Sequence, residues 1–352
     1  MLIDVLPVHE FGFELQVCQW AEHNWPPGRE SERPVIVARQ LGTKRRRWDT
    51  LVVECNPEGL AARARFGEHR LDSDLLGVVR HAPAEWAWYR DALPEPDYPW
   101  RYVREAVHRA ADRGLIDRRR DSGRIEFRRR WPYPDWIERI VAVENKPDMD
   151  ASAARDLAGQ IERDVALALA DEVWIATLAT DCRVEPVLLE DTPVEAGILV
   201  VEDDTRGADA ASVVWQPRSL PVETPGTRIL DRPTGSRHDD SACRFEYADP
   251  GWKADKRLAI AERAYERGWR SYVDSMRPDC RQFQLRPDEA VARPFCAAKK
   301  RPQTPGECSQ TCDDFEPEPP AWRVKGWPVD GGPGKAIKRL LGRQRERQRP
   351  GR

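Results

Sequence analysis

The sequence predicts an α/β protein built around a mixed β-sheet that is flanked by helices. Residues 35–55 contain two β-rich runs around a basic turn that includes Gly42, which is the pattern of an antiparallel hairpin. Residues 137–177 contain an apolar strand, a long helix and a second apolar strand, which is the pattern of a crossover between parallel strands. Because both patterns occur in one chain, we expect antiparallel and parallel strands in the same sheet.

The first part of the sheet domain is expected at residues 1–58. Residues 9–23 carry apolar side chains at helical spacing and predict the first helix. Residues 35–40 and 48–55 predict the two strands of the hairpin, with residues 41–47 as the turn between them.

Residues 59–131 have a different pattern, in which three helices precede a β-hairpin. The helices are expected at 73–81, 84–93 and 100–113, and each is bounded by a capping residue, a proline or a glycine. The hairpin is expected over 115–130, with a turn at Asp121-Ser122-Gly123. This order resembles a winged-helix module, inserted between the two parts of the sheet domain.

The second part of the sheet domain is expected at residues 132–202. Alternating apolar residues predict a strand at 137–144, and a long helix follows at 152–170. A short apolar strand is expected at 172–177, and residues 184–201 are expected to add one or two further strands.

The remaining residues are expected to lie outside the sheet. Residues 203–250 are rich in Pro, Gly, Ser, Thr and Asp and predict a linker or a long excursion. Residues 251–316 are expected to be a cysteine-rich segment that starts with a helix at 252–277. Residues 317–352 are expected to be a connector and a basic tail.

Composition and charge restrict the class of protein. The chain has 352 residues, of which 40% are hydrophobic, enough for two or three domains with buried cores. No run approaches the roughly 18 apolar residues of a membrane span, and the first ten residues lack the pattern of a signal peptide. We therefore expect a cytoplasmic protein with no membrane partner. Because 57 basic residues nearly balance 60 acidic ones, net charge identifies no partner.

Asp49, Glu144 and Lys146 have the character of a site that hydrolyses phosphodiesters. Carboxylates are the ligands that Mg²⁺ and Mn²⁺ prefer, and the bound cation lowers the pKa of a water molecule. Asp49 and Glu144 lie on expected strands from which both carboxylates can point into one site. Lys146 projects from the same face as Glu144 and can orient or deprotonate the attacking water. Alternatively, Glu144 and Lys146 form an exposed ion pair and Asp49 caps a turn.

Through these residues the chain resembles the PD-(D/E)XK nuclease superfamily, particularly its restriction-endonuclease-like and archaeal Holliday-junction-resolvase-like branches. The resemblance extends from Glu10 to about Val201. Trp48-Asp49 is similar to the aspartate-bearing second strand, and Glu144-Asn145-Lys146 is similar to the ExK strand. The resemblance implies a restriction-endonuclease-like fold and a metal-dependent nuclease activity.

The resemblance also implies roles for two residues outside these strands. Glu14 on the first helix is expected to support the metal shell, and Gln160 on the crossover helix is expected to support the lysine or the substrate. Periodicity alone leaves Glu10 as an alternative to Glu14, because it lies one helical turn earlier. Roughly 95 residues separate the two metal-binding carboxylates, where compact members of the superfamily have a short turn. The chain also resembles an uncharacterised PD-(D/E)XK-like family of halophilic archaea, which implies no known activity.

The winged-helix-like insert is the expected nucleic-acid contact, because arginine side chains reach both phosphate groups and base edges. The candidates lie on its third helix and its hairpin, and they are Arg104, Arg109, Arg118, Arg119, Arg128 and Arg129. The alternative is an ordinary insertion with a solvated surface or a module that contacts protein.

Four cysteines near the C-terminus have the spacing C-x15-C-x11-C-x3-C, and they are Cys280, Cys296, Cys308 and Cys312. Four thiols within 33 residues can complete a tetrahedral site for zinc or hold an iron–sulfur cluster. Some nucleases of the superfamily bind such a cluster with one cysteine near the first helix, so the resemblance allows Cys18 as a ligand. The alternative is free reduced thiols.

The sequence therefore predicts a metal-dependent nuclease that acts on DNA in repair, recombination or defence. Its cofactor is expected to be Mg²⁺ or Mn²⁺, with zinc or an iron–sulfur cluster as a second metal centre. The alternative is a non-catalytic DNA-binding or regulatory protein in which the insert binds and the core is structural. A homodimer or a repair or defence complex is the expected assembly.

Overall fold

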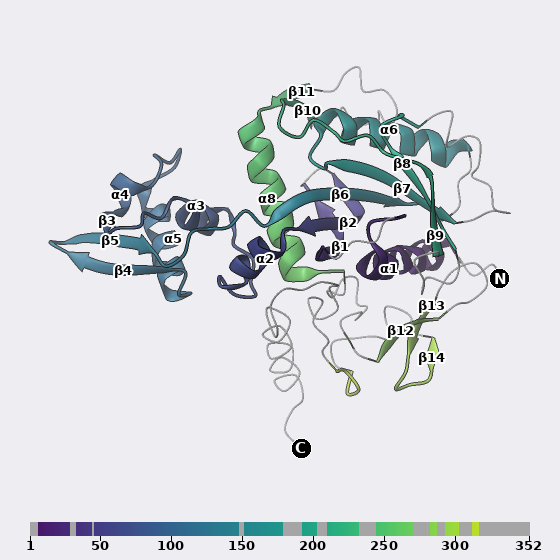
Figure 1. The fold of residues 1–352 in the computed structure, drawn as a ribbon, viewed down its shortest axis with the longest axis horizontal. Coiled ribbons are helices and arrows are strands. Elements are labelled where there is room, and N and C mark those ends of the chain that lie inside the picture. The colour runs from purple at the N-terminus through teal and green to yellow at the C-terminus, as the bar shows by residue number, and fades with distance from the viewer. Residues whose placement is uncertain are drawn as a thin grey trace.

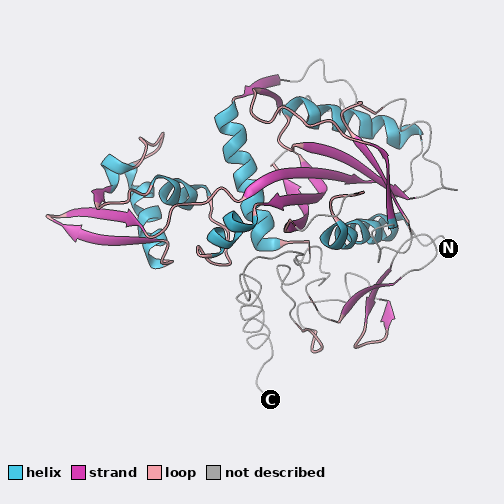
Figure 2. Ribbon diagram, viewed as in Figure 1, coloured by secondary structure: helices cyan, strands magenta, loops and turns pink. Residues whose placement is uncertain are grey.

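The structure of the protein is a computed structural model. It describes residues 6–28, 33–43, 46–147, 151–178, 192–202, 210–231, 244–269, 280, 282–286, 293–302 and 312–316. Figures 1 and 2 show a central sheet with helices on both faces and a smaller module extending to one side. The predicted class, an α/β protein with a mixed sheet flanked by helices, is confirmed.

The central sheet has six strands in the order β1-β2-β6-β7-β8-β9. Strands β1, β2 and β6 are antiparallel neighbours, β6, β7 and β8 are parallel, and β9 is antiparallel to β8. The expected hairpin and the expected parallel crossover are therefore both present. The strand bounds are β1 Val35–Gly42, β2 Arg47–Cys55, β6 Ile137–Asn145, β7 Glu172–Leu178, β8 Gly197–Val201 and β9 Ala211–Trp215.

Helices cover both faces of the sheet. Helix α1 (Leu6–Asn24) packs on one face, while α6 (Ala151–Leu167) and α8 (Pro250–Arg267) pack on the other. In β6, Val141 and Val143 face α1, whereas the alternate residues face α6 and α8. This explains why β6 is apolar on both sides rather than amphipathic. None of the described helices has the length and apolar character needed to cross a membrane.

Helix α1 is buried on nearly all sides, whereas the sequence predicted a single apolar stripe. A three-stranded sheet contacts the helix in addition to the central sheet. Its strands are β12 (Phe283–Arg286), β13 (Arg293–Cys296) and β14 (Arg301–Pro302), and Figure 1 shows them beside α1. The additional burial therefore comes from the cysteine-rich segment, which is far from α1 in the sequence.

Residues 203–250, expected to be a linker, contribute strands to the fold. Strand β9 pairs with β8 and forms the sixth strand of the central sheet. Strands β10 (Gly226–Asp231) and β11 (Arg244–Ala248) pair with each other. A Cβ at Gly226 would lie 2.4 Å from the carbonyl oxygen of Leu167, so glycine allows this hairpin to approach the end of α6. The polar composition of the segment concealed its short strands, of which only β9 is mainly apolar.

The inserted module has its own hydrophobic core. Its three-stranded sheet has the order β3-β5-β4. The helix expected at 84–93 is instead a short strand followed by a one-turn helix, because Ala87 and Trp88 pair with Phe127 and Glu126 on β5. The element bounds are α3 Ser73–His81, β3 Ala87–Trp88, α4 Tyr89–Ala92, α5 Trp100–Asp112, β4 Ile116–Asp121 and β5 Arg124–Arg129.

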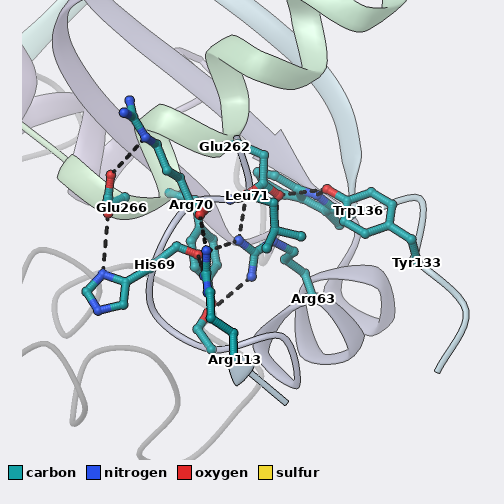
Figure 3. A network of polar contacts seen from close by, with 11 residues as sticks. Arg63, His69, Arg70, Leu71, Arg113, Tyr133, Trp136, Glu262 and Glu266 are labelled. Carbon is teal, nitrogen blue, oxygen red and sulfur yellow. Dashed lines mark hydrogen bonds and ion pairs between the residues drawn. The ribbon is translucent and has the colours of Figure 1, made fainter. Parts of the chain in front are cut away.

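A buried ion pair joins the module to the central domain (Figure 3). Arg63 lies on α2 (Pro57–Ala64), which follows β2 directly, and Glu262 lies on α8. Two guanidinium nitrogens of Arg63 donate to the two carboxylate oxygens of Glu262, each at 2.6 Å. Tyr133 Oη and the backbone N–H of Leu71 also donate to Glu262, each at 2.7 Å. Because these donors satisfy the carboxylate, its burial is compensated by hydrogen bonds as well as by charge.

Replacing Glu262 with alanine is expected to lower the free energy of unfolding by about 3–5 kcal/mol, since Arg63 would remain charged without its partner. Both side chains are 0% exposed, so water cannot take the place of the carboxylate. Urea-induced unfolding measures the difference. Glu266→Ala, one turn further along α8 at a position 31% exposed, is the matched control and should cost about 1 kcal/mol or less. Equal losses in the two variants would contradict the assigned role of the pair.

Candidate functional site

Strands β2 and β6 place two of the predicted site residues side by side. Thr50 is paired with Val143, and continuing this register by one residue sets Asp49 opposite Glu144. The two side chains therefore lie at the same end of neighbouring strands, and alternation with Val143 places Glu144 on the face that α6 and α8 cover. The backbone N–H of Asn145 donates to Asp49 Oδ2 at 3.0 Å, which fixes that carboxylate at the end of β6. Glu144 is buried.

Glu14 reaches the same region from α1 through Gln40. Gln40 Nε2 donates to Glu14 Oε2 at 3.0 Å and to Asp49 Oδ1 at 3.2 Å. Gln40 has a φ of 53°, a conformation that a non-glycine residue keeps only where its surroundings hold it. On its other side, Glu14 accepts a hydrogen bond from Nη1 of the buried Arg39 at 3.1 Å. The structure therefore brings Glu14 into the site, with Gln40 as a connecting residue that sequence analysis missed.

Arg46 connects Glu144 to a fourth carboxylate, Asp164. Arg46 Nη2 donates to Glu144 Oε1 at 2.6 Å and to Asp164 Oδ2 at 2.7 Å. Its Nε donates to both oxygens of Asp164, at 2.9 and 3.0 Å. Asp164 lies on α6 and faces the core with Leu157 and Ile161, seven and three residues earlier. Sequence analysis missed Asp164, although an acidic residue in this apolar stripe is a signal that could have found it, because unpaired carboxylates are rarely buried.

Lys146 and Gln160 lie close in sequence to carboxylates of the site. Lys146 follows β6 directly, and its backbone N–H donates to the carbonyl oxygen of Ala176 on β7 at 2.8 Å. Gln160 is half-buried on α6, one helical turn before Asp164. Their expected functions, water activation by Lys146 and support by Gln160, stay predictions.

Burial and mutual repulsion favour the protonated form of two site carboxylates. Burial raises the pKa of Glu144 to about 8, and the charge of Asp49 adds to this, while Arg46 opposes it. Burial also raises the pKa of Glu14 to about 7, against the opposing charge of Arg39. The site therefore concentrates more negative charge than an interior normally accepts.

The donor chemistry of this site suits a hard divalent cation, although the side chains are not arranged around one. Carboxylate oxygens are the ligands that Mg²⁺ and Mn²⁺ prefer, and Asp49 and Glu144 are the residues that would hold the ion. Among the described residues, no group of three or more His, Cys, Asp or Glu side chains is placed to hold a metal. In this arrangement Glu144 is bound by Arg46 instead.

Comparison with known proteins places this site within a protein family. Residues 36–317 match the family described as "Family of unknown function (DUF5787)". The chain belongs to this family. The matched DUF5787 region includes Asp49, Glu144 and Asp164, together with the entire inserted module. Neither the comparison with curated proteins nor that with solved structures gives a match.

Three of the four predicted cysteine ligands lie in the described part of this DUF5787 chain, and Cys308 lies outside it. Cys280 Sγ accepts a hydrogen bond from the backbone N–H of Glu316 at 3.4 Å, and Cys296 Sγ accepts one from Lys299 at 3.5 Å. Cys312 is half-buried.

Cys18 is buried in the core and its thiol faces the central sheet. Its Sγ lies 3.3 Å from Thr50 Oγ1 on β2. Cys18 therefore packs between α1 and the sheet, where cysteine behaves as a small hydrophobic side chain.

The predicted nucleic-acid arginines share the module but not one surface. Arg119 and Arg128 lie on one face of the β4–β5 hairpin and stack on Trp86, with distances of 4.5 and 4.8 Å from Cζ to the ring centroid. Because strand side chains alternate, Arg118 and Arg129 lie on the opposite face.

The two predicted arginines of α5 differ in their contacts. Arg109 forms ion pairs with Asp72 and Asp74, each at 3.0 Å, at the start of α3. Arg104 is exposed on the same helix. The candidate nucleic-acid arginines are therefore of two kinds. Some already form ion pairs within the module, and Arg104 is exposed to solvent.

The raised pKa of Glu144 predicts a pH dependence of stability in metal-free protein. As the pH rises from about 4.5 to about 8, Glu144 loses its proton in the unfolded chain before it does so in the folded one. The folded state then binds more protons, so the free energy of unfolding should decrease over this interval. In Glu144→Gln, the free energy of unfolding should fall less over this interval than in the wild type, by more than about 1 kcal/mol. Urea unfolding in a chelating buffer measures the difference.

The exposed Glu58 in the first turn of α2 supplies the matched control. Glu58→Gln removes an equal charge at the surface and should leave the pH profile as it is in the wild type. A Glu144→Gln profile with the wild-type slope would show that Glu144 does not titrate in this interval.

Proposed function

We propose that the protein is a metal-dependent nuclease of the PD-(D/E)XK type, acting on the phosphodiester bonds of DNA. The observation that carries the proposal is the position of Asp49 and Glu144 on neighbouring strands, at one end of the sheet. Lys146 follows two residues after Glu144. Two carboxylates and a lysine in this relation have the chemistry that phosphodiester hydrolysis requires.

The connectivity around the site supports the same proposal. Helix α1 is followed by the antiparallel strands β1, β2 and β6, and α6 then leads to β7, which is parallel to β6. This succession agrees with a restriction-endonuclease-like core in which residues 59–131 are an insertion. In the module, three helices precede a hairpin, and a short strand completes its sheet, which supports a winged-helix-like assignment.

We propose one role for each residue of the site. Asp49 and Glu144 would hold Mg²⁺ or Mn²⁺, which when bound lowers the pKa of a water ligand and neutralises a non-bridging phosphate oxygen. Lys146 positions the attacking water, either by orienting it or, in its neutral form, by accepting its proton at Nζ. Glu14 acts as a positioning residue, because Gln40 links its carboxylate to that of Asp49. Gln160 supports the lysine or the substrate.

The charge of the module supports nucleic acid as the partner. Residues 114–131 contain seven arginines against three acidic residues. The ion pairs that these arginines form are at the surface, where such pairs contribute little and can be exchanged for phosphate contacts. The same observation favours a second candidate function, a non-catalytic DNA-binding or regulatory protein. In either case we propose a cytoplasmic protein that acts as a homodimer or within a repair or defence complex.

We propose in addition that Cys280, Cys296, Cys308 and Cys312 bind zinc or an iron–sulfur cluster. Backbone N–H donors to Cys280 and Cys296 support this, because such donors stabilise thiolate sulfur in metal centres. Metal analysis of the purified protein should find zinc or iron. Cys280→Ser should remove at least half of it, whereas Cys55→Ser, at a buried cysteine in the central core, should retain it. Full metal retention in Cys280→Ser would eliminate Cys280 as a ligand.

The nuclease proposal predicts DNA cleavage in the presence of Mg²⁺ or Mn²⁺ and none in a chelating buffer. Duplex, branched and single-stranded DNA should each be incubated with the purified chain, and the products separated by gel electrophoresis. Lys146→Ala should slow cleavage by about 100-fold or more, since it removes the group that positions the attacking water. Lys256→Ala, at an exposed position on α8, should cut at the wild-type rate.

Binding measured on the same substrates separates the two candidate functions. Retardation of DNA by the wild type without cleavage under any divalent metal would support the non-catalytic function and reject the nuclease. Cleavage that persists in a folded Lys146→Ala variant at the wild-type rate would reject the mechanism while retaining the activity. Urea unfolding of both lysine variants verifies that they are folded.

A further inference from the structure

We propose that Arg46 is an internal counter-ion of the carboxylate site, and that its guanidinium must leave Glu144 before a divalent cation binds there. The proposal rests on the proposed function only in assuming that the site binds a divalent cation. It adds a regulatory device, in which the protein holds its own cation in place of the metal.

The contacts of Arg46 show how completely it occupies the site. Nη2 lies 2.6 Å from Glu144 Oε1 and 2.7 Å from Asp164 Oδ2, so one nitrogen bridges the two carboxylates. The carboxylate side chains are 4% and 2% exposed, whereas the arginine is 19% exposed. Two buried carboxylates that are ionised without a cation would be strongly unfavourable, and Arg46 supplies the positive charge that compensates them.

Simultaneous occupation by Arg46 and a divalent ion is unfavourable on two grounds. Arg46 Nη2 already donates to Glu144 Oε1, one of the two oxygens that a cation would use on this carboxylate. A divalent cation on this carboxylate would also lie within a few ångströms of the guanidinium, where water screens the repulsion between the two positive charges only partly. The two cations therefore compete, and the measured metal affinity includes the cost of displacing the arginine.

The local structure allows the side chain to leave while its backbone stays in place. Arg46 lies in the turn before β2, and its backbone is held by Thr43: the Thr43 N–H donates to Arg46 O at 2.6 Å and Thr43 Oγ1 accepts from the Arg46 N–H at 3.1 Å. The guanidinium is on a long side chain that is partly open to solvent. Rotation about its side-chain bonds carries the charge outward without breaking the β1–β2 hairpin.

The experiment measures Mn²⁺ binding directly, by electron paramagnetic resonance of the free ion and by calorimetry, without reference to cleavage. Arg46→Met removes the charge and keeps a side chain of similar reach, and it should tighten Mn²⁺ binding by at least about tenfold. Arg46→Lys keeps the charge without the bidentate fork, and it should give an intermediate affinity. The control is Arg47→Met, at the exposed neighbouring residue, which should bind Mn²⁺ as the wild type does.

The outcomes separate this inference from the nuclease proposal. Equal Mn²⁺ affinity in wild type, Arg46→Met and Arg46→Lys would overturn the counter-ion role, even if the protein cuts DNA. Tighter binding in Arg46→Met without any cleavage by the wild type would support the counter-ion role and reject the nuclease. If Arg46→Met does not fold, Arg46→Lys decides the question, because wild-type affinity in that variant also overturns the proposal.

Discussion

The antiparallel pairing of β2 with β6 is the constraint on which the rest of the structure depends. These strands are neighbours in the sheet although the whole inserted module separates them in the chain. Their register sets Asp49 beside Glu144. It also places the end of β2 next to the start of β6, so the two ends of the inserted segment lie close together. The entropic cost of closing such a connection grows slowly with its length, so a folded insertion is tolerated where a short turn would suffice.

Buried arginines make this register specific. Arg39 pairs with Glu14 on the α1 face, and Arg46 pairs with Glu144 on the opposite face. Because strand side chains alternate, a slip of one residue would exchange the two faces and leave buried charges without partners. Arginine suits both positions because it remains charged when it is partly or fully buried, and at Arg46 its planar fork also donates to three carboxylate oxygens. The charges that give the site its chemical character therefore also restrict how the sheet can pair.

Helix α8 links the candidate site to the inserted module. Its apolar side covers the sheet face that bears Glu144, and its Glu262 holds Arg63 and the segment that leads into the module. The orientation of the arginine-rich hairpin relative to the carboxylates is thus fixed partly by one helix. In the proposed function, this arrangement would hold a nucleic acid bound by the module at a defined position with respect to the site.

The sequence by itself determined the strands around the crossover and singled out Glu144, because alternation and turn residues are local signals that a short window contains. It also led to Glu14, through the resemblance of its helix to a known family. Only the tertiary structure decided that Arg46 and Asp164 complete the site, since Arg46 contacts Glu144 across 98 residues of chain and Asp164 across 118. The same holds for residues 203–250, where short strands acquire their stability from a neighbouring strand. Contacts of this range depend on packing, and no local periodicity encodes them.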